Sequence, residues 1–189
     1  MMKNKIIYTL FMLGILSCKA QTISLDQLSQ CKPTKNCPDY VYLKDTNNRL
    51  NKFVGTWKGT YSDGRTYELH FIKKENDGGW FNEKFWDKLI GRVLVKTIDG
   101  NTLYNSLNYN DLDAMGGFYF DKELKKYQLY YSGNADCNDK GYVYVSFPDP
   151  NNLNQMELVF VQDRDIIASC SNAYKTVMPS GKKIILTKQ

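Results

Sequence analysis

The chain has 189 residues, a formal net charge of +5 and 42% hydrophobic residues. This length is enough for one domain with a hydrophobic core of useful size. Acidic and basic residues are interspersed as on an ordinary solvated surface, so the small positive excess gives no argument for nucleic acid as a partner, and we expect none.

Residues 1–20 have the pattern of an export signal. A basic start is followed by the apolar run Ile6–Leu16. The residues Ile15–Cys18 at its end have the pattern of a lipobox. The run is too short to span a bilayer, which takes about twenty apolar residues. We therefore predict an exported protein of the bacterial cell envelope, anchored in the membrane by a lipid on Cys18. Cleavage after Ala20, which would release the protein, is the alternative.

Four cysteines remain once Cys18 is lipidated or removed with the signal. Cys31, Cys37, Cys137 and Cys170 are an even number, as expected of disulfides in an oxidising compartment. Three pairings are open to them, and we favour the local one, Cys31–Cys37 with Cys137–Cys170. No CxxC spacing is present, so a metal site made of thiolates is disfavoured and no metal is predicted.

Residues 21–48 are predicted to form an N-terminal extension, stapled by a disulfide and stretched out as a tether between membrane and domain. The segment is polar and contains Pro33 and Pro38. A short helical turn is expected over Thr46–Phe53, where a polar residue can cap the first turn. The domain itself is assigned to residues 49–189.

From Val54 onward the pattern changes to an alternation of period two, which indicates β-strands. The predicted strands are Gly55–Tyr61, Arg65–Lys73, Gly91–Ile98, Thr102–Tyr109, Gly117–Asp121, Lys126–Ser132, Gly141–Phe147, Gln155–Gln162 and Lys182–Lys188. Turn signals such as Asp63-Gly64 separate them. We therefore predict an all-β fold, a single antiparallel up-and-down barrel of roughly eight to ten strands, with a sandwich as the alternative.

Two stretches interrupt this rhythm. Gly78–Leu89 carries several aromatic residues, with Phe81 and Phe85 four positions apart, and is interpreted as a helical lid or an aromatic loop. Arg164–Met178 is interpreted as a long connection held by Cys170.

Residues 50–57, with the sequence LNKFVGTW, are a helical turn followed by Gly-x-Trp at the start of the first strand. This resembles the opening of the lipocalins and related calycin barrels. In that family the tryptophan plugs the closed end of the barrel, and a basic residue of the last strand packs across it. The resemblance gives these roles to Trp57 and to Lys182 or Lys183, and it implies a small lipocalin-like barrel.

A second resemblance covers more of the chain. The signal ending in CKAQ at residues 18–21, the segments YLKD at 42–45 and LNKFVGTWKGT at 50–60, and the terminal ILTKQ at 185–189 resemble a family of exported bacterial lipoproteins. The spacing of Cys137 and Cys170 fits the same pattern. That family has no assigned activity, so the resemblance supports export and a single domain and implies nothing about chemistry.

No residues form a recognisable catalytic or metal-binding set. His70 is the single histidine and is predicted on the outer face of a strand. The pairs Asp111/Asp113 and Asp163/Asp165 lie beside predicted loops, where solvated carboxylates are normal. There is no nucleophile elbow, phosphate loop or dinucleotide fingerprint. We therefore predict no catalytic residue and no cofactor, and we expect that the protein is not an enzyme.

The leading hypothesis for function is a membrane-tethered barrel that binds a small apolar or amphipathic ligand. The candidate ligand-binding residues are the inward-facing aromatic side chains Trp57, Tyr61, Tyr67, Phe71 and Tyr104. Small barrels either hold a ligand or are filled by their own side chains, and the bulk of these residues favours filling. The alternatives are a non-enzymatic structural or interaction module of the envelope, which would contact a protein partner through Trp80–Trp86, and a glycan-binding domain that uses stacked tyrosines.

Overall fold

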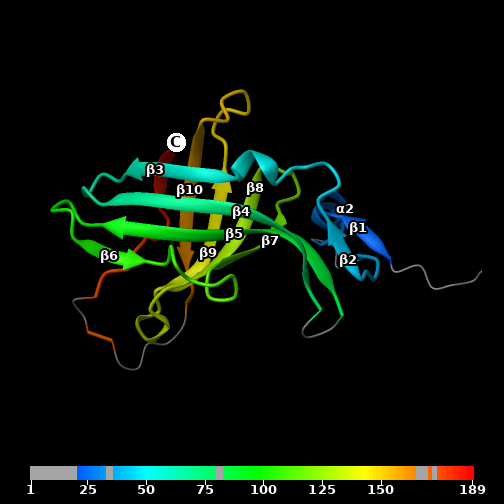
Figure 1. Cartoon of the computed structure of the whole chain (residues 1–189), viewed down its shortest axis with the longest axis horizontal. Helices are drawn as coiled ribbons and strands as arrows, with labels where there is room; N and C mark the ends of the chain where they lie inside the picture. The colour runs from blue at the N-terminus through cyan, green and yellow to red at the C-terminus, as the bar shows by residue number, and fades with distance from the viewer. Residues whose placement is uncertain (1–20, 33–35, 80–82, 165–169, 172–173) are drawn as a thin grey trace, which may run out of the picture.

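The computed structural model describes residues 21–32, 36–79, 83–164, 170–171 and 174–189 (Figure 1). These residues form a closed antiparallel barrel of eight strands with further strands at its side, so the predicted all-β barrel is confirmed. The barrel strands are β3 (Gly55–Thr60), β4 (Thr66–Gly78), β5 (Phe85–Lys96), β7 (Met115–Phe120), β8 (Lys126–Ser132), β9 (Lys140–Ser146), β10 (Gln155–Gln162) and β11 (Lys183–Lys188).

The barrel closes where its first and last strands pair. Lys188 of β11 stands opposite Trp57 of β3, and Thr187 stands opposite Lys58. At the other seam Ile90 of β5 pairs with Gly116 of β7. These two seams exclude the sandwich alternative, because a sandwich leaves such strand edges open.

Alternation of inward and outward residues explains why these segments became strands. In β9, Val143 and Val145 are buried in the core, whereas Tyr142 and Tyr144 point outward. The tight turn between β3 and β4 has Gly64 at φ +85°, a conformation that favours glycine. The period-two pattern, together with the local turn signals, therefore predicted these hairpins correctly.

The segment Gly78–Leu89 differs from its prediction. It is neither a helical lid nor a loop throughout, since β4 continues to Gly78 and β5 already begins at Phe85. A register shift between Lys74 and Asp77 lets the long hairpin bend without losing its pairing. Conversely, β6 (Thr102–Asn105) is shorter than the strand predicted to reach Tyr109.

Three strands pair in succession along one edge of β5. Its first residues pair in parallel with β2, its middle pairs with β7, and its last residues pair with β6. The other edge of β5 pairs with β4 along almost its whole length. Strand β5 therefore joins both β2 and β6 to the barrel.

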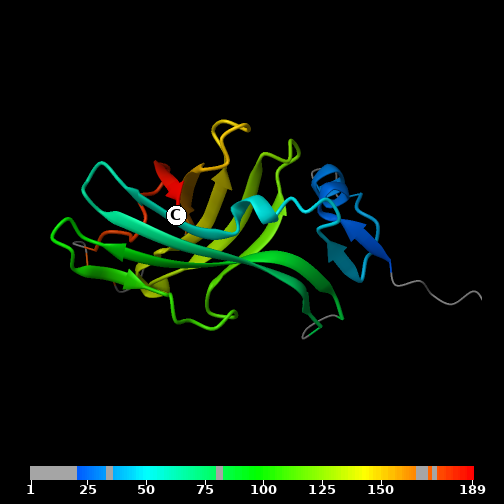
Figure 2. The same ribbon diagram turned by 45° about the horizontal axis from the view of Figure 1, so that its top comes forward.

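The N-terminal extension is folded, and the prediction of a stretched-out tether is wrong for this segment. It forms β1 (Thr22–Ser24), α2 (Leu25–Cys31) and β2 (Tyr42–Lys44), which lie together at one end of the barrel (Figure 2). The side chain of Ser24 caps α2 in a capping box with Gln27. Apolar residues of the helix and of β2 are buried against the core, and this burial holds the extension in place.

Both predicted disulfides are present. Cys31 is bonded to Cys37 within the extension, and Cys137 is bonded to Cys170 beside the barrel. In the part of the chain that the structure describes, no helix has the length and apolar character needed to cross a membrane.

Replacing Cys31 and Cys37 together by serine is expected to lower the free energy of unfolding by about 2 kcal/mol, because the unfolded chain regains the freedom of a short closed loop. Equilibrium unfolding in urea measures the difference from the wild type. The control is intact-mass analysis, which must show that the Cys137–Cys170 bond is retained. An unchanged free energy would mean that α2 and β2 hold this loop without the bond.

Candidate functional site

The residues predicted to bind a ligand inside the barrel belong to its core or lie against it. Trp57, Tyr67 and Phe71 are at most 2% exposed, and Tyr61 and Tyr104 are half-buried and pack against the same cluster. Their own rings occupy the barrel interior, as their bulk indicated.

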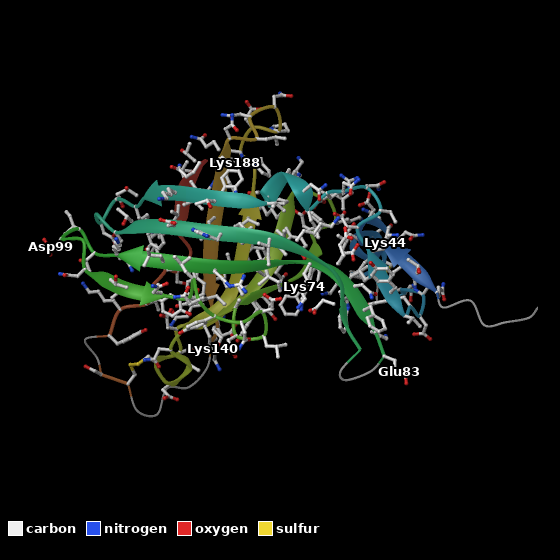
Figure 3. The ribbon with its side chains drawn as sticks, viewed as in Figure 1. Lys44, Lys74, Glu83, Asp99, Lys140 and Lys188 are labelled. Carbon is white, nitrogen blue, oxygen red and sulfur yellow. A yellow bond between two sulfur atoms is a disulfide. The ribbon has the colours of Figure 1, made fainter. Side chains whose placement is uncertain are left out.

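Trp57 is fixed by two contacts at one end of the barrel. Its indole nitrogen donates a hydrogen bond to the carbonyl oxygen of Phe53 at 2.7 Å. The Nζ atom of Lys188, a residue labelled in Figure 3, lies 5.4 Å from the centroid of the Trp57 ring. A basic residue of the last strand therefore does pack across the tryptophan, but it is Lys188. The expectation of Lys182 or Lys183 was wrong because strand register, which the sequence does not show, places Lys188 opposite Trp57.

A groove lies on the outside of the barrel, between the N-terminal extension and β7. We call it the α2–β7 groove, and its volume is about 470 Å³. The extension contributes Leu28, Lys32, Cys37, Tyr40 and Leu43 to its lining. The barrel contributes Trp86, Lys88, Gly117, Phe118 and Tyr119. Its two walls come from distant parts of the chain, so no local pattern in the sequence could have revealed it.

Positive charge surrounds this groove. The Nζ atom of Lys32 lies 2.7 Å from the centroid of the Tyr119 ring, and that of Lys84 lies 4.7 Å from the centroid of the Tyr40 ring. Such contacts between an ammonium group and a ring face are favourable. None of the described residues that line the groove is acidic.

Lys88 is the lining residue whose charge is already compensated. Its Nζ atom forms an ion pair at 2.6 Å with Asp77, which is nearly buried. Burial alone would raise the pKa of Asp77, but hydrogen bonds from Lys88 and Lys74 outweigh it and hold that pKa below its usual value. Asp77 therefore stays ionised and compensates the charge of Lys88. Lys32, the other lysine of the lining, faces the Tyr119 ring and not a carboxylate.

The buried carboxylate of Asp87 holds the inner wall of the groove. It accepts hydrogen bonds from the Tyr42 hydroxyl at 2.5 Å, from the Asp45 amide at 2.9 Å and from the Asn76 amide at 3.0 Å. Burial, followed by the hydrogen bond to Asp87, raises the pKa of Tyr42 to about 12. Because these three donors come from β2, the residue after it and the β4–β5 hairpin, Asp87 fixes the extension to the barrel.

A second buried carboxylate lies near the Cys137–Cys170 disulfide. Asp139 is 0% exposed, and its Oδ2 atom accepts hydrogen bonds from the Tyr174 hydroxyl at 2.9 Å, the Val177 amide at 3.1 Å and the Tyr131 hydroxyl at 3.4 Å. Its Oδ1 atom has no partner among the described residues. Burial raises the pKa of this carboxyl group. Sequence reasoning missed Asp139, because a polar residue beside a turn is ordinarily solvated.

The remaining titratable residues singled out in the sequence contact nearby polar or charged side chains. Asp113 accepts a hydrogen bond from the Asn110 side chain at 2.6 Å, and Asp163 accepts one from the Tyr130 hydroxyl at 2.7 Å. His70 lies 2.7 Å from Glu68, and Asp111 bridges Lys74 and Arg92 at 2.7 and 2.6 Å. No group of three or more His, Cys, Asp or Glu residues that could hold a metal ion occurs in the described ranges. Asp165 lies outside the described residues.

The aromatic patch proposed over residues 80–86 is divided. Trp80 and Phe81 lie outside the described residues. Phe85 and Trp86 belong to β5, where Trp86 packs against the core and lines the α2–β7 groove. Trp86 therefore takes part in a concave site and not in a protruding contact patch.

Comparison of the chain with known proteins identifies its family but assigns it no activity. No match to the chain was found among curated proteins or among solved structures. A family model described as a family of unknown function (DUF6705) matches residues 1–189. The chain therefore belongs to this family, DUF6705, over its whole length.

Proposed function

We propose that the protein is an exported, lipid-anchored barrel of the cell envelope that binds an amphipathic ligand, without catalysis, in the α2–β7 groove. The anchor would be a lipid on Cys18, and two disulfides fit the oxidising compartment that export implies. The groove carries the proposal, because its volume of about 470 Å³ lies within the usual range of small-molecule sites.

The chemistry of the lining indicates the kind of ligand. Leu28, Trp86 and Phe118 offer apolar surface to an acyl chain, and Phe118 is 47% exposed. Lys32 offers a positive charge to an anionic head group, and none of the described lining residues is an acid that would repel such a group. A fatty acid or a similar single-chain anion fits this combination. The barrel interior is the weaker candidate because its own rings fill it.

The test is a fluorescence titration with a long-chain fatty acid and with the uncharged alcohol of the same chain length. Phe118→Ser is expected to weaken binding of both about tenfold, because the ring no longer covers the chain. Lys32→Glu is expected to weaken binding of the fatty acid alone, by about tenfold, since only the fatty acid carries a negative charge.

Matched controls come from exposed residues away from the groove. Ile98→Ser removes an apolar side chain that is 76% exposed two residues beyond the end of β5, and Lys96→Glu reverses a charge at the far end of β5. Both variants are expected to bind like the wild type. Saturable binding that Phe118→Ser leaves unchanged would move the site elsewhere, and no saturable binding of either probe would refute the proposed function.

A second candidate, binding of a glycan, is supported by the outer face of β8 and β9. Tyr130 and Tyr142 are paired across these strands with ring centroids 5.4 Å apart. A hollow of about 610 Å³ beside Tyr130 is also lined by Ser132 and Asp113, which can accept hydrogen bonds from sugar hydroxyls. Affinity electrophoresis in gels that contain peptidoglycan fragments, with Tyr142→Ala as the comparison, separates this candidate from the first.

A further inference from the structure

The start of the described chain is fixed at one end of the molecule. The carbonyl oxygen of Gln21 accepts hydrogen bonds from the Val41 amide at 2.9 Å and the Tyr42 amide at 3.3 Å. Strand β1 follows directly and pairs with β2, which in turn pairs with the first residues of β5. Gln21 is therefore part of the folded structure, and any anchor upstream of it acts on this end.

The tether between this point and the lipid would be very short. Cys18 precedes Gln21 by three residues, and three residues span at most about 11 Å even when fully extended. Strand β5 alone, with 12 residues, is about 40 Å long. The lipid would therefore keep the Gln21 end of the barrel at the bilayer, whereas nothing in this tether holds the opposite end there.

Figure 3 shows which residues lie at the two ends. Lys44 and Glu83 lie on the side of the N-terminal extension, whereas Asp99 lies at the other end, beyond the last residue of β5. Lys84 comes directly before the first residue of β5, and Lys96 is its last residue. The two ends of the strand therefore carry the same reactive group, a lysine amine.

The surface around Gln21 has the composition of a membrane interface. Val41 is 38% exposed, and its carbonyl oxygen accepts a hydrogen bond from the Phe85 amide at 2.7 Å. Beside it the Lys84 ammonium lies over the Tyr40 ring. Tyrosine and lysine with apolar neighbours are the residues that settle at the level of lipid head groups.

We infer that the face formed by Gln21, Tyr40, Val41, Lys84 and Phe85 lies on the lipid bilayer and holds the barrel in one orientation. We call it the membrane-facing end. Tyr40 also lines the α2–β7 groove, so the groove opens beside this face and takes its ligand from the leaflet. The inference rests on the lipid anchor of the proposed function.

The test is lysine acylation of the full-length protein, isolated from the envelope and bound to phospholipid vesicles. Intact-mass analysis first reports the lipid on Cys18. A water-soluble acylating reagent then modifies exposed lysines, and mass spectrometry follows each one. Lys84 is expected to react several-fold more slowly on vesicles than in detergent-free protein clipped to residues 21–189, whereas Lys96 reacts equally fast in both.

The outcomes separate the two proposals. Absence of the lipid from Cys18 refutes the anchor and, with it, this orientation. A lipid on Cys18 together with equal reactivity of Lys84 in both samples overturns the membrane-facing end and leaves the anchor standing. Protection of Lys96 as strong as that of Lys84 overturns the single orientation in the same way.

Discussion

Replacing Trp57 by alanine is expected to lower the free energy of unfolding by about 4 kcal/mol, the usual cost of removing a buried aromatic side chain. The ring is 0% exposed and makes an edge contact with Phe147 at 5.9 Å between centroids. Its loss also leaves the Phe53 carbonyl without its donor and removes the surface over which Lys188 packs. Because small domains are stable by about 5–15 kcal/mol, much of the stability would be lost. Urea unfolding followed by tyrosine fluorescence measures the change.

Two further variants control this experiment. Trp57→Phe keeps a ring and removes the N–H donor, so a smaller loss of about 1–2 kcal/mol is expected. Tyr142→Ala removes an aromatic ring that is 38% exposed on β9, and little change is expected. If Trp57→Ala lowers the free energy of unfolding no more than Tyr142→Ala does, burial of the Trp57 ring does not stabilise the barrel.

The second large effect is expected at Asp139. Asp139→Ala removes the acceptor shared by Tyr131, Tyr174 and the Val177 amide, and about 4 kcal/mol of stability should be lost because buried donors are left without partners. Asp139→Asn keeps the shape of the side chain and one acceptor oxygen, so it should change the free energy of unfolding little at acidic pH.

The stability conferred by Asp139 should depend on pH in a direction unusual for a carboxylate. Burial raises the folded-state pKa above the ordinary value of 3.8, although the charge of Arg65 opposes the rise. The contribution is therefore complete below the ordinary pKa and is lost as the pH rises through the raised value. Asparagine cannot ionise, so Asp139→Asn should gain stability relative to the wild type as the pH is raised.

Urea unfolding of the wild type and of Asp139→Asn between about pH 4 and pH 8 gives this difference, and ion pairs common to both proteins cancel. Asp63→Asn is a suitable comparison, because hydrogen bonds from Arg65 lower the pKa of Asp63 and its contribution is lost as the pH falls. A difference between wild type and Asp139→Asn that stays constant with pH would show that the pKa of Asp139 is the same in the folded and the unfolded protein, contrary to the raised pKa expected from burial.

The barrel could be predicted from the sequence because its strands pair with neighbours along the chain. The hairpin of β8 and β9, for example, needs only alternation and a local turn, and both are visible in the sequence. The extension was missed because β1 and β2 are short and pair in parallel, and because β2 depends on β5 far along the chain. Ser24 and Gln27, however, form a capping box that could have revealed α2.

The error over Gly78–Leu89 has a different origin. Phe81 and Phe85 are four positions apart, which suggested a helix, but Phe85 begins β5, and β4 reaches Gly78 after an irregular step between Lys74 and Asp77. The candidate site was beyond prediction for a third reason. Phe118 and Leu28 meet only after the barrel and the extension have assembled, and no rule of spacing links them.

The closing seam of the barrel has a consequence for the order of folding. Lys188 stands opposite Trp57, Thr187 stands opposite Lys58, and the Thr56 carbonyl accepts a hydrogen bond from the amide of Gln189, so β3 is completed only by β11 and the residue after it. A chain that emerges N-terminus first therefore holds β3 with one edge unpaired until β11 becomes available. Truncation before Lys183 should leave that edge open and promote aggregation.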